Sequence, residues 1–341
     1  MKLSDFHYDL PGELIAQHPA DQRSHSRMLV LNRKEHSIND CHFYDLPDFI
    51  DENYFIVVND SKVFKARLLG QRATGAKVKV LLVRRLENGN WIALLKPSAR
   101  IHKGEKILID SENYITAEDD PGEPGREISF VSPNSENHII STYGKLPLPP
   151  YIKRDADEVD DNRYQTVYAQ NTGSVAAPTA GLHFDEKTLA RLAEKKIAIE
   201  QLTLHVGPGT FKSVTTDRIE DHTIDPEFAN ISETTAGNIN EARKSGKKLL
   251  AVGTTCIRTL EAISESDGNL RACNEMVNTF IYPPYKFKAV DALITNFHLP
   301  DTSLMMLISA FYGREFLLEA YRHAVAEKYR FYSYGDCMLI L

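Results

Sequence analysis

The sequence predicts an α/β fold in which a discontinuous α/β domain carries an inserted small all-β barrel domain. From Val63 onward, short apolar runs recur at roughly ten-residue spacing, which is typical of a small barrel or sandwich. Beyond Tyr151, strand and helix patterns alternate as in an α/β domain. The length of 341 residues favours roughly two compact units. We therefore expect residues 1–62 and 150–341 to form the α/β domain and residues 63–149 to form the barrel.

Two apolar runs near the beginning of the chain predict buried strands of the α/β domain. Met28–Leu31 leads into a polar turn, and Phe55–Val58 is stopped by the turn-forming residues Asn59, Asp60 and Ser61. The first strands of the α/β domain therefore precede the barrel in the chain.

The barrel segment contains a hairpin signal. Val78–Val83 and Trp91–Leu95 flank an Asn88-Gly89 pair, which favours a tight turn between two antiparallel strands. Further strands are expected at Ile107–Ile109 and Ile128–Val131, and the prolines of Lys145–Pro150 mark the exit from the barrel.

In the second part of the α/β domain, Asp185 and Ser232 are suitable helix N-caps and Gly246 can end a helix. Helices are expected within residues 185–193, 232–246, 255–263, 303–311 and 315–329. Strands are expected at 197–206, 249–252, 279–282 and 292–297, and around Phe331 and Met338.

The composition is that of an ordinary folded protein, with 42% hydrophobic and 26% charged residues. The sequence contains neither a signal-peptide core nor an apolar stretch long enough to span a bilayer, so we expect a cytoplasmic protein without membrane contact. The four cysteines are scattered, which predicts neither a disulfide framework nor a metal site.

A net charge of −7 argues against non-specific coating of nucleic acid, but one segment is locally basic. Between Lys62 and Lys106, basic residues far outnumber the acidic residues Glu87 and Glu105. Candidate phosphate contacts in this segment are Lys62, Lys77, Lys79, Arg84 and Arg85. The alternative is a solvated strand surface on which lysines discourage edge pairing. Because Lys77 and Lys79 alternate with Val78 and Val80, a strand would turn both lysines outward.

Four glycine-containing segments place reactive groups at the ends of predicted strands, where α/β proteins bind ligands. They are Gly173–Phe184, Leu204–Phe211, Ala251–Arg258 and Leu293–Pro300. Each segment alone also has a structural explanation, because glycine makes turns and an isolated histidine is often a hydrogen-bonded core residue.

The third segment has the pattern of an anion site, because the free amides at the start of a helix attract carboxylate or phosphate. It lacks G-x-G-x-x-G and the P-loop lysine, so neither a dinucleotide nor an ATP site is indicated. A small carboxylate fits better, with the amides of Thr254 and Thr255 and the guanidinium of Arg258 as its partners.

Taken in order, these segments resemble one family, the S-adenosylmethionine:tRNA ribosyltransferase-isomerases. The resemblance covers nearly the whole chain and also includes Phe6–Pro11, Val58–Val63, Leu148–Ile152, Arg163–Tyr168 and Phe331–Asp336. The sequence departs from the usual pattern at Cys256, which stands at a hydroxyl position, and at Pro226 and Pro284. These departures remove none of the histidines, aspartates or arginines of the motifs.

The resemblance implies that S-adenosylmethionine is consumed as a ribosyl donor, with no separate cofactor. The other substrate would be a tRNA with 7-aminomethyl-7-deazaguanine at the wobble position, giving epoxyqueuosine while adenine and methionine leave. The family fold, an α/β domain with an inserted barrel, agrees with the reading of the segments above. The resemblance makes the barrel the candidate tRNA-contacting module. Separately, we expect the protein to be a monomer.

This chemistry needs groups that move protons near neutral pH, for which imidazoles are suited. The candidate catalytic residues are His183, His205, His298, His222 and Glu227, the last two as a possible imidazole–carboxylate pair. The candidate substrate-binding residues are Asn59, Asp60, Arg67, Thr179, Thr210, Thr254, Thr255, Arg258, Tyr282 and Asn296. Tyr282 or Tyr285 would face the sulfonium. Asn59 and Asp60 would accept from a guanine-like edge or, alternatively, simply close a strand.

Two other classes remain possible from the sequence. A methyltransferase is disfavoured because no glycine-rich loop with a following acidic residue comes after an early strand. A non-catalytic RNA-binding protein is favoured only by the basic segment.

Overall fold

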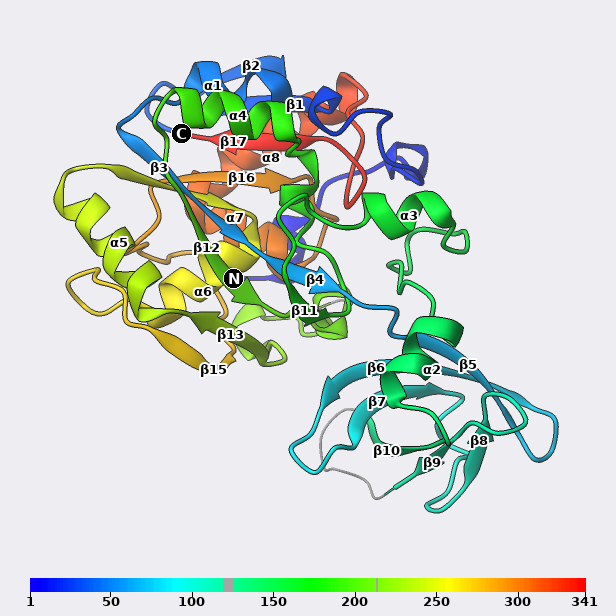
Figure 1. The fold of residues 1–341 in the computed structure, drawn as a ribbon. Coiled ribbons are helices and arrows are strands. Elements are labelled where there is room, and N and C mark those ends of the chain that lie inside the picture. The colour runs from blue at the N-terminus through cyan, green and yellow to red at the C-terminus, as the bar shows by residue number, and fades with distance from the viewer. Residues whose placement is uncertain (119–124, 213) are drawn as a thin grey trace.

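The computed structural model describes residues 1–118, 125–212 and 214–341. A layered α/β part holds both chain ends, and a β-barrel hangs below it in Figure 1, joined to it by two chain crossings. The expected fold class, an α/β domain with an inserted all-β barrel, is therefore confirmed.

The α/β part is built on one nine-stranded sheet. Its order is β15 (Cys273–Val277), β13 (Glu227–Ile231), β12 (Ile199–Leu204), β3 (Tyr54–Asn59), β14 (Lys248–Val252), β16 (Ala292–Asn296), β17 (Cys337–Ile340), β1 (Arg27–Asn32) and β2 (Ser37–His42). Strands β12, β3, β14 and β16 run parallel to one another. Their carboxyl ends therefore meet at one edge of the sheet, which we call the carboxyl edge.

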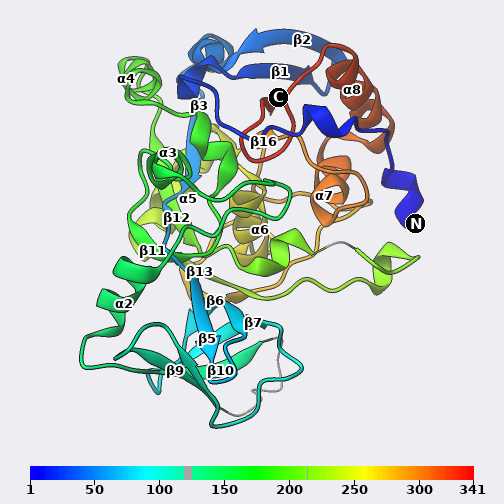
Figure 2. The ribbon, with the colours of Figure 1, turned by 90° about the vertical axis from the view of Figure 1, so that its right-hand side faces the viewer.

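Helices cover both faces of this sheet (Figures 1 and 2). One apolar core packs the sheet against α5 (Glu233–Lys244), α6 (Thr254–Ile263), α7 (Ser303–Tyr312) and α8 (Arg314–Ala326). The other packs it against α1 (Leu46–Phe49) and α4 (Glu186–Glu194). Burial on both faces explains why the central strands are continuous apolar runs rather than alternating ones.

The barrel is closed by six antiparallel strands. They are β5 (Arg67–Arg72), β6 (Lys77–Arg85), β7 (Trp91–Lys96), β8 (Lys106–Leu108), β9 (Tyr114–Ala117) and β10 (Arg126–Val131), in the order β10-β7-β6-β5-β8-β9. Val78 and Val80 are buried in its core, while Lys77 and Lys79 are exposed. The alternation expected for this strand is confirmed.

Short elements connect the two parts. Strand β4 (Ser61–Val63) pairs in parallel with β11 (Asn171–Ser174), and α2 (Glu136–Tyr143) and α3 (Glu158–Arg163) lie on the return path. Short 3-10 helices are Leu3–Phe6, Gly12–Leu14, Arg23–His25, Phe43–Asp45, Thr179–His183, Pro208–Phe211 and Ile219–Asp221. The Arg67 side chain donates to the carbonyl of Leu148 at 2.9 Å and so fastens the returning chain to the first barrel strand.

The strand predicted at Thr279–Tyr282 is wrong. Strand β15 ends at Val277, where it pairs with Glu227, and the chain then runs irregularly toward Pro283 and Pro284. Prolines lack the amide hydrogen that a ladder requires, so the apolar residues of this segment pack without forming a strand. The residues around Phe331 form a single bridge to Ile15 rather than a strand.

No helix in the described ranges is long and apolar enough to cross a membrane.

Candidate active site

The reactive segments converge at the carboxyl edge. Asn59 ends β3, His205 follows β12, Gly253 follows β14 and Asn296 ends β16. Because these four strands are parallel neighbours, segments far apart in the sequence meet there. Two adjoining pockets open at this edge.

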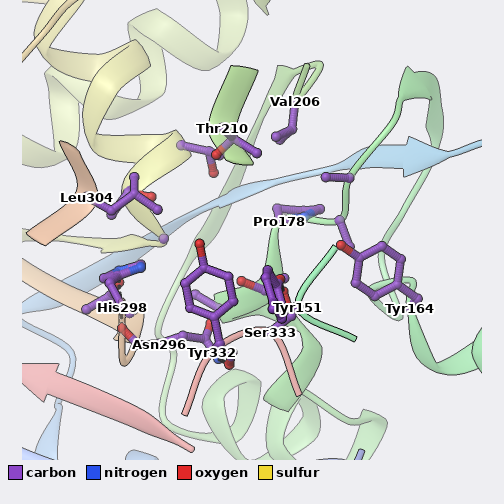
Figure 3. A pocket seen from close by; sticks show the side chains of 18 residues that line it. Tyr151, Tyr164, Pro178, Val206, Thr210, Asn296, His298, Leu304, Tyr332 and Ser333 are labelled. Atoms are coloured by element: carbon purple, nitrogen blue, oxygen red, sulfur yellow. Dashed lines mark hydrogen bonds between the residues drawn. The ribbon is translucent and has the colours of Figure 1, made fainter. Parts of the chain in front are cut away.

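The narrow pocket, drawn in Figure 3, is the smaller of the two. Its lining includes Tyr151, Tyr164, Tyr332, Asn296, His298 and the residues Gly253–Thr255. Thr179 and Thr210 also line it, so both stay candidates for substrate binding. Aromatic rings thus face polar groups from the ends of β14 and β16.

Helix α6 points its N-terminus into the narrow pocket. Gly253 has a φ of 91°, a backbone conformation that residues other than glycine rarely adopt. No side chain donates or accepts a capping hydrogen bond at this helix start. The amides of Thr254 and Thr255 have no intrahelical acceptor at this position and carry the positive end of the helix dipole. The strand–turn–helix geometry predicted at Gly253-Thr254-Thr255 is present, and binding of an anion there stays a prediction.

His183 and Asn296 form a buried pair behind the narrow pocket. Asn296 Nδ2 lies 3.1 Å from the carbonyl of Tyr332, and it donates to His183 Nε2 at 3.2 Å. Since Nε2 accepts, the proton of the neutral His183 ring is on Nδ1. Nδ1 donates it to Ser26 Oγ at 2.6 Å. Burial, with Arg23 and Arg330 nearby, lowers the pKa of His183 to about 3. Both ring nitrogens of His183 are bonded to protein groups, so we interpret His183 as a residue that positions Asn296.

His298 is placed differently, because it lines the narrow pocket. Its Nε2 is 2.9 Å from Thr295 Oγ1, and burial lowers its pKa to about 3. The backbone of His298 is held independently of the ring, since its amide donates to Tyr321 Oη and its carbonyl accepts from Tyr8 Oη. The imidazole is therefore neutral near pH 7.

The wide pocket lies between the two parts of the chain. One wall is the outer face of the barrel, formed by Val83, Arg84, Ile92 and Leu94, and the other wall comes from the α/β part. The wide and narrow pockets share Thr210 and Leu304, so a long ligand can occupy both.

Arg258 and Glu227 form a buried ion pair at the wide pocket. Arg258 Nη1 donates to Glu227 Oε2 at 2.6 Å, and the amide of Gly207 donates to Oε1 at 2.8 Å. Nε and Nη2 of Arg258 find no acceptor within the described residues, although they are buried. These two atoms form one edge of the guanidinium, which can receive two acceptor atoms of a ligand.

The other candidates around the wide pocket are more loosely placed. His222 lines it and contacts the ring of Phe280, while Glu227, suggested as its partner, is bonded to Arg258 instead. Burial lowers the pKa of His222, against an opposing effect of Asp225. Tyr282 lies beside Phe280 outside both linings, as far as the described residues define them. Tyr285 donates its hydroxyl to Glu261.

His205 is held by a chain of hydroxyl groups. Val206 N and Ser61 Oγ both donate to Ser174 Oγ at 2.7 Å. Because the hydroxyl of Ser61 has given its proton to Ser174, it accepts from His205 Nδ1 at 2.9 Å. This leaves Nε2 unprotonated. The ring is half-buried between Gly173 and the ring of Phe228, and burial lowers its pKa against an opposing effect of Asp60. It lies outside the linings of the narrow and wide pockets, judged on the described residues.

Asn59 and Asp60 are both buried and bonded within the protein. Asn59 exchanges two hydrogen bonds with the backbone of Leu204, which ties β3 to β12. Asp60 accepts from Thr203 Oγ1 at 2.7 Å and from Asn171 Nδ2 at 2.9 Å. Their observed bonds fit the alternative that they close a strand.

The basic residues lie on the outside of the barrel and its connection. Lys62, Lys77, Lys79, Arg84 and Arg85 are all exposed. Arg85 pairs with Glu136 at 2.8 Å. Lys79 stands directly opposite Lys96 on the neighbouring strand, an arrangement of like charges that is unfavourable unless an anion lies nearby.

Sequence reasoning missed the tyrosines of the narrow pocket. Tyr151 and Tyr332 lie at right angles with ring centroids 3.9 Å apart, and the ring of Tyr164 is fully buried beside them. Their signal was present, because Leu148–Ile152, Arg163–Tyr168 and Phe331–Asp336 belong to the matching motifs. Their positions in the sequence are too far apart for a spacing pattern to predict that the three side chains meet in one pocket.

In the part of the chain that the structure describes, no group of three or more His, Cys, Asp or Glu residues is arranged to hold a metal.

A parallel sheet edge with two adjoining pockets, one of them walled by an inserted barrel, is typical of an α/β enzyme that binds its ligand at the carboxyl ends of its strands. The family described as "Queuosine biosynthesis protein" matches residues 3–340. Relatives named "S-adenosylmethionine:tRNA ribosyltransferase-isomerase" are 46% identical in Symbiobacterium thermophilum and 44% identical in Thermotoga maritima, each covering 100% of both chains. The crystal structure of S-adenosylmethionine tRNA ribosyltransferase from Thermotoga maritima matches with a TM-score of 0.56 and 34% identity, covering 99% of this chain and 100% of that one. The chain belongs to the S-adenosylmethionine:tRNA ribosyltransferase-isomerase family.

Proposed function

We propose that this enzyme transfers and isomerises the ribosyl group of S-adenosylmethionine onto 7-aminomethyl-7-deazaguanine at the wobble position of tRNA. The product is epoxyqueuosine, and adenine and methionine leave. The observation that carries the proposal is the full-length family match together with the convergence of its motifs on the two adjoining pockets.

The two pockets divide the substrates in a simple way. S-adenosylmethionine spans the narrow pocket and part of the wide one, and the wobble base enters the wide pocket from the barrel side. An unstacked anticodon base can reach such a pocket, whereas a base within a helix cannot. The free edge of Arg258 and the hydroxyl of Thr210 are then available to substrate acceptors in the wide pocket.

Proton transfer is assigned by position and charge. His298 accepts the proton from the carbon next to the sulfonium, because it is neutral and lines the narrow pocket. His222, which lines the wide pocket, serves the leaving adenine and the incoming amine, and Glu227 acts by orienting Arg258. His205 lies outside both linings, so we propose that it acts through the residues around it. Replacing His205 by Ala should lower turnover far more than tRNA affinity, and unchanged turnover would remove His205 from the mechanism.

The barrel, residues 63–149, acts as the tRNA-contacting module of a monomeric enzyme. Lys77, Lys79 and Lys96 share the barrel face that continues into the wall of the wide pocket. Phosphates beside the bound base would lie against this face.

The direct test is to chromatograph the products after incubation with S-adenosylmethionine and tRNA bearing 7-aminomethyl-7-deazaguanine. Free adenine and methionine in equal amounts support the proposal. S-adenosylhomocysteine would identify a methyltransferase instead, and unconsumed S-adenosylmethionine with bound tRNA would identify a non-catalytic RNA-binding protein.

A further inference from the structure

The narrow pocket contains buried polar atoms that the protein itself leaves unused. Asn296 is 2% exposed, and its Oδ1 has no partner within residues 1–118, 125–212 and 214–341. Since Nδ2 of the same amide faces the carbonyls of Tyr332 and Asp336, the orientation is fixed and the unused atom is the acceptor. An orphaned buried carbonyl is costly unless a ligand completes it.

Unused donors occupy the same pocket. The first amides of α6, from Thr254 and Thr255, lack intrahelical acceptors, and Thr255 Oγ1 is buried without a hydrogen-bond partner among the described residues. A helix start of this kind favours a carboxylate. The pocket therefore offers donors for an anion and an acceptor for a cationic amine.

The tyrosine rings add a third feature. Tyr151, Tyr164 and Tyr332 all line the narrow pocket (Figure 3). Tyr332 has φ of 74°, which a non-glycine residue adopts only when its surroundings impose it, and strain of this kind is common where a side chain contacts a ligand. Faces of aromatic rings attract cations.

We propose that the narrow pocket is an α-amino-acid subsite for the methionyl end of S-adenosylmethionine. The carboxylate binds the first amides of α6 and Thr255 Oγ1, the ammonium donates to Asn296 Oδ1, and the sulfonium lies against the tyrosine rings. The inference rests on the proposed function for the identity of the ligand. It places Arg258 outside this subsite, because that residue lines the wide pocket and is already bonded to Glu227.

A ligand series tests the subsite on the unaltered enzyme. Free L-methionine should compete with S-adenosylmethionine and bind at least about tenfold more tightly than 4-methylthiobutanoic acid, which lacks the ammonium, or 3-methylthiopropylamine, which lacks the carboxylate. Titration calorimetry gives the three affinities. Equal binding of methionine and either analogue, or methionine that does not compete, would overturn the proposal.

A single substitution tests which protein groups bind the carboxylate. Thr255→Val should weaken methionine binding about tenfold through the missing hydroxyl and the disturbed helix start. Thr259→Val is the matched control, because Thr259 lies one turn later in α6 and donates its hydroxyl to the carbonyl of Thr255. Parent-like affinity of a folded Thr255→Val protein would contradict the carboxylate assignment.

The cation contact is tested by charge. Tyr332→Leu should weaken binding of S-adenosylmethionine at least about threefold more than binding of S-adenosylhomocysteine, which lacks the positive sulfur. General damage to the pocket would weaken both equally and would overturn this contact.

If methionine binds as expected but no adenine is released with tRNA, the subsite stands and the proposed function fails. Adenine release without methionine binding would instead support the proposed function and overturn the subsite.

Discussion

The carboxyl edge of the sheet and the outer face of the barrel present polar groups in opposite ways. At the sheet edge, His183, Asn296 and Glu227 are buried and bonded to specific protein atoms. On the barrel, Lys77 and Lys79 are exposed, and Lys79 faces another lysine. This difference fits the proposed division of work, in which the edge is preorganised for one small substrate and the barrel face attracts a flexible polyanion.

Under the proposed function, burial holds the reacting groups of the edge in place. Burial lowers the pKa values of His183 and His298, so both imidazoles are neutral near pH 7. Exposed lysines keep their charge and move freely, which serves attraction but not proton transfer.

Replacing His298 by Ala should lower the turnover number about 10²–10⁴-fold, the usual range for removal of a general base. Affinity for tRNA should stay within about twofold, because no phosphate interaction is removed. The fold should survive, since Tyr8 and Tyr321 hold the backbone of residue 298 rather than its ring. Single-turnover release of adenine measures the step. His138→Ala, an exposed histidine on α2, is the control, and parent-like turnover by His298→Ala would reassign the base.

Asp160→Asn should cost about 2–4 kcal/mol of stability, because it breaks a buried ion pair. Asp160 accepts from Arg154 Nη2 at 2.8 Å and from Tyr334 Oη at 2.6 Å. Burial opposes ionisation, but these bonds outweigh it and lower the pKa of Asp160 to about 2. The depressed value means that the stabilisation is present above the ordinary pKa and is lost as pH falls toward about 2.

Urea unfolding near neutral pH measures this loss, with exposed Asp155→Asn as the matched control. An Asp160→Asn protein as stable as the parent would show that the bonds of Asp160 to Arg154 and Tyr334 contribute nothing to the free energy of unfolding.

The sequence predicted the two-part fold because strand periodicity and helix caps are local signals. The cap at Asp185 is observed as a bond from the amide of Thr188, and the Asn88-Gly89 turn is observed with Gly89 at positive φ. The strand at Thr279–Tyr282 failed because apolar composition alone does not reveal whether a ladder partner is present.

The site was predictable only in part. Segments at strand ends could be located, because parallel strands collect them at one edge. Which histidine would line the narrow pocket depended on packing across the whole chain. The ring nitrogens of His183 face Ser26 and Asn296, while His298 lines the narrow pocket. The tyrosines of the narrow pocket come from three separate connecting segments, whose positions follow from tertiary contacts alone.

His183→Gln should change the pH dependence of stability more than its value near pH 8. Burial holds the pKa of His183 near 3, below its ordinary 6.5, so the unfolded chain binds the proton first as pH falls. Stability therefore declines below about pH 6.5, by about 2 kcal/mol at pH 5 for each such histidine. Denaturant titrations at both pH values should show a shallower decline for His183→Gln. A decline equal to that of the parent would contradict a neutral buried His183.

The smallest effect per residue is expected on the barrel. Lys77, Lys79 and Lys96 lie on one outer face of β6 and β7, and the repulsion between Lys79 and Lys96 is relieved only when an anion binds. Removing one lysine–phosphate interaction should reduce the log–log salt slope of tRNA affinity by about 0.7–0.9. Changing all three to Gln should therefore flatten the salt dependence, while affinity for S-adenosylmethionine stays unchanged.

The matched control for this variant replaces Lys34, Lys196 and Lys244 by Gln. These residues are equally exposed, but they adjoin strand ends at the edge of the sheet opposite the pockets. The three control substitutions remove the same total charge as the barrel variant, so they correct for the long-range attraction between the protein and tRNA. A barrel variant whose salt slope equals that of this control would assign the barrel lysines to solubility. A slope reduced only in the barrel variant, with adenine release restored at saturating tRNA, would separate attraction on the barrel from chemistry at the sheet edge.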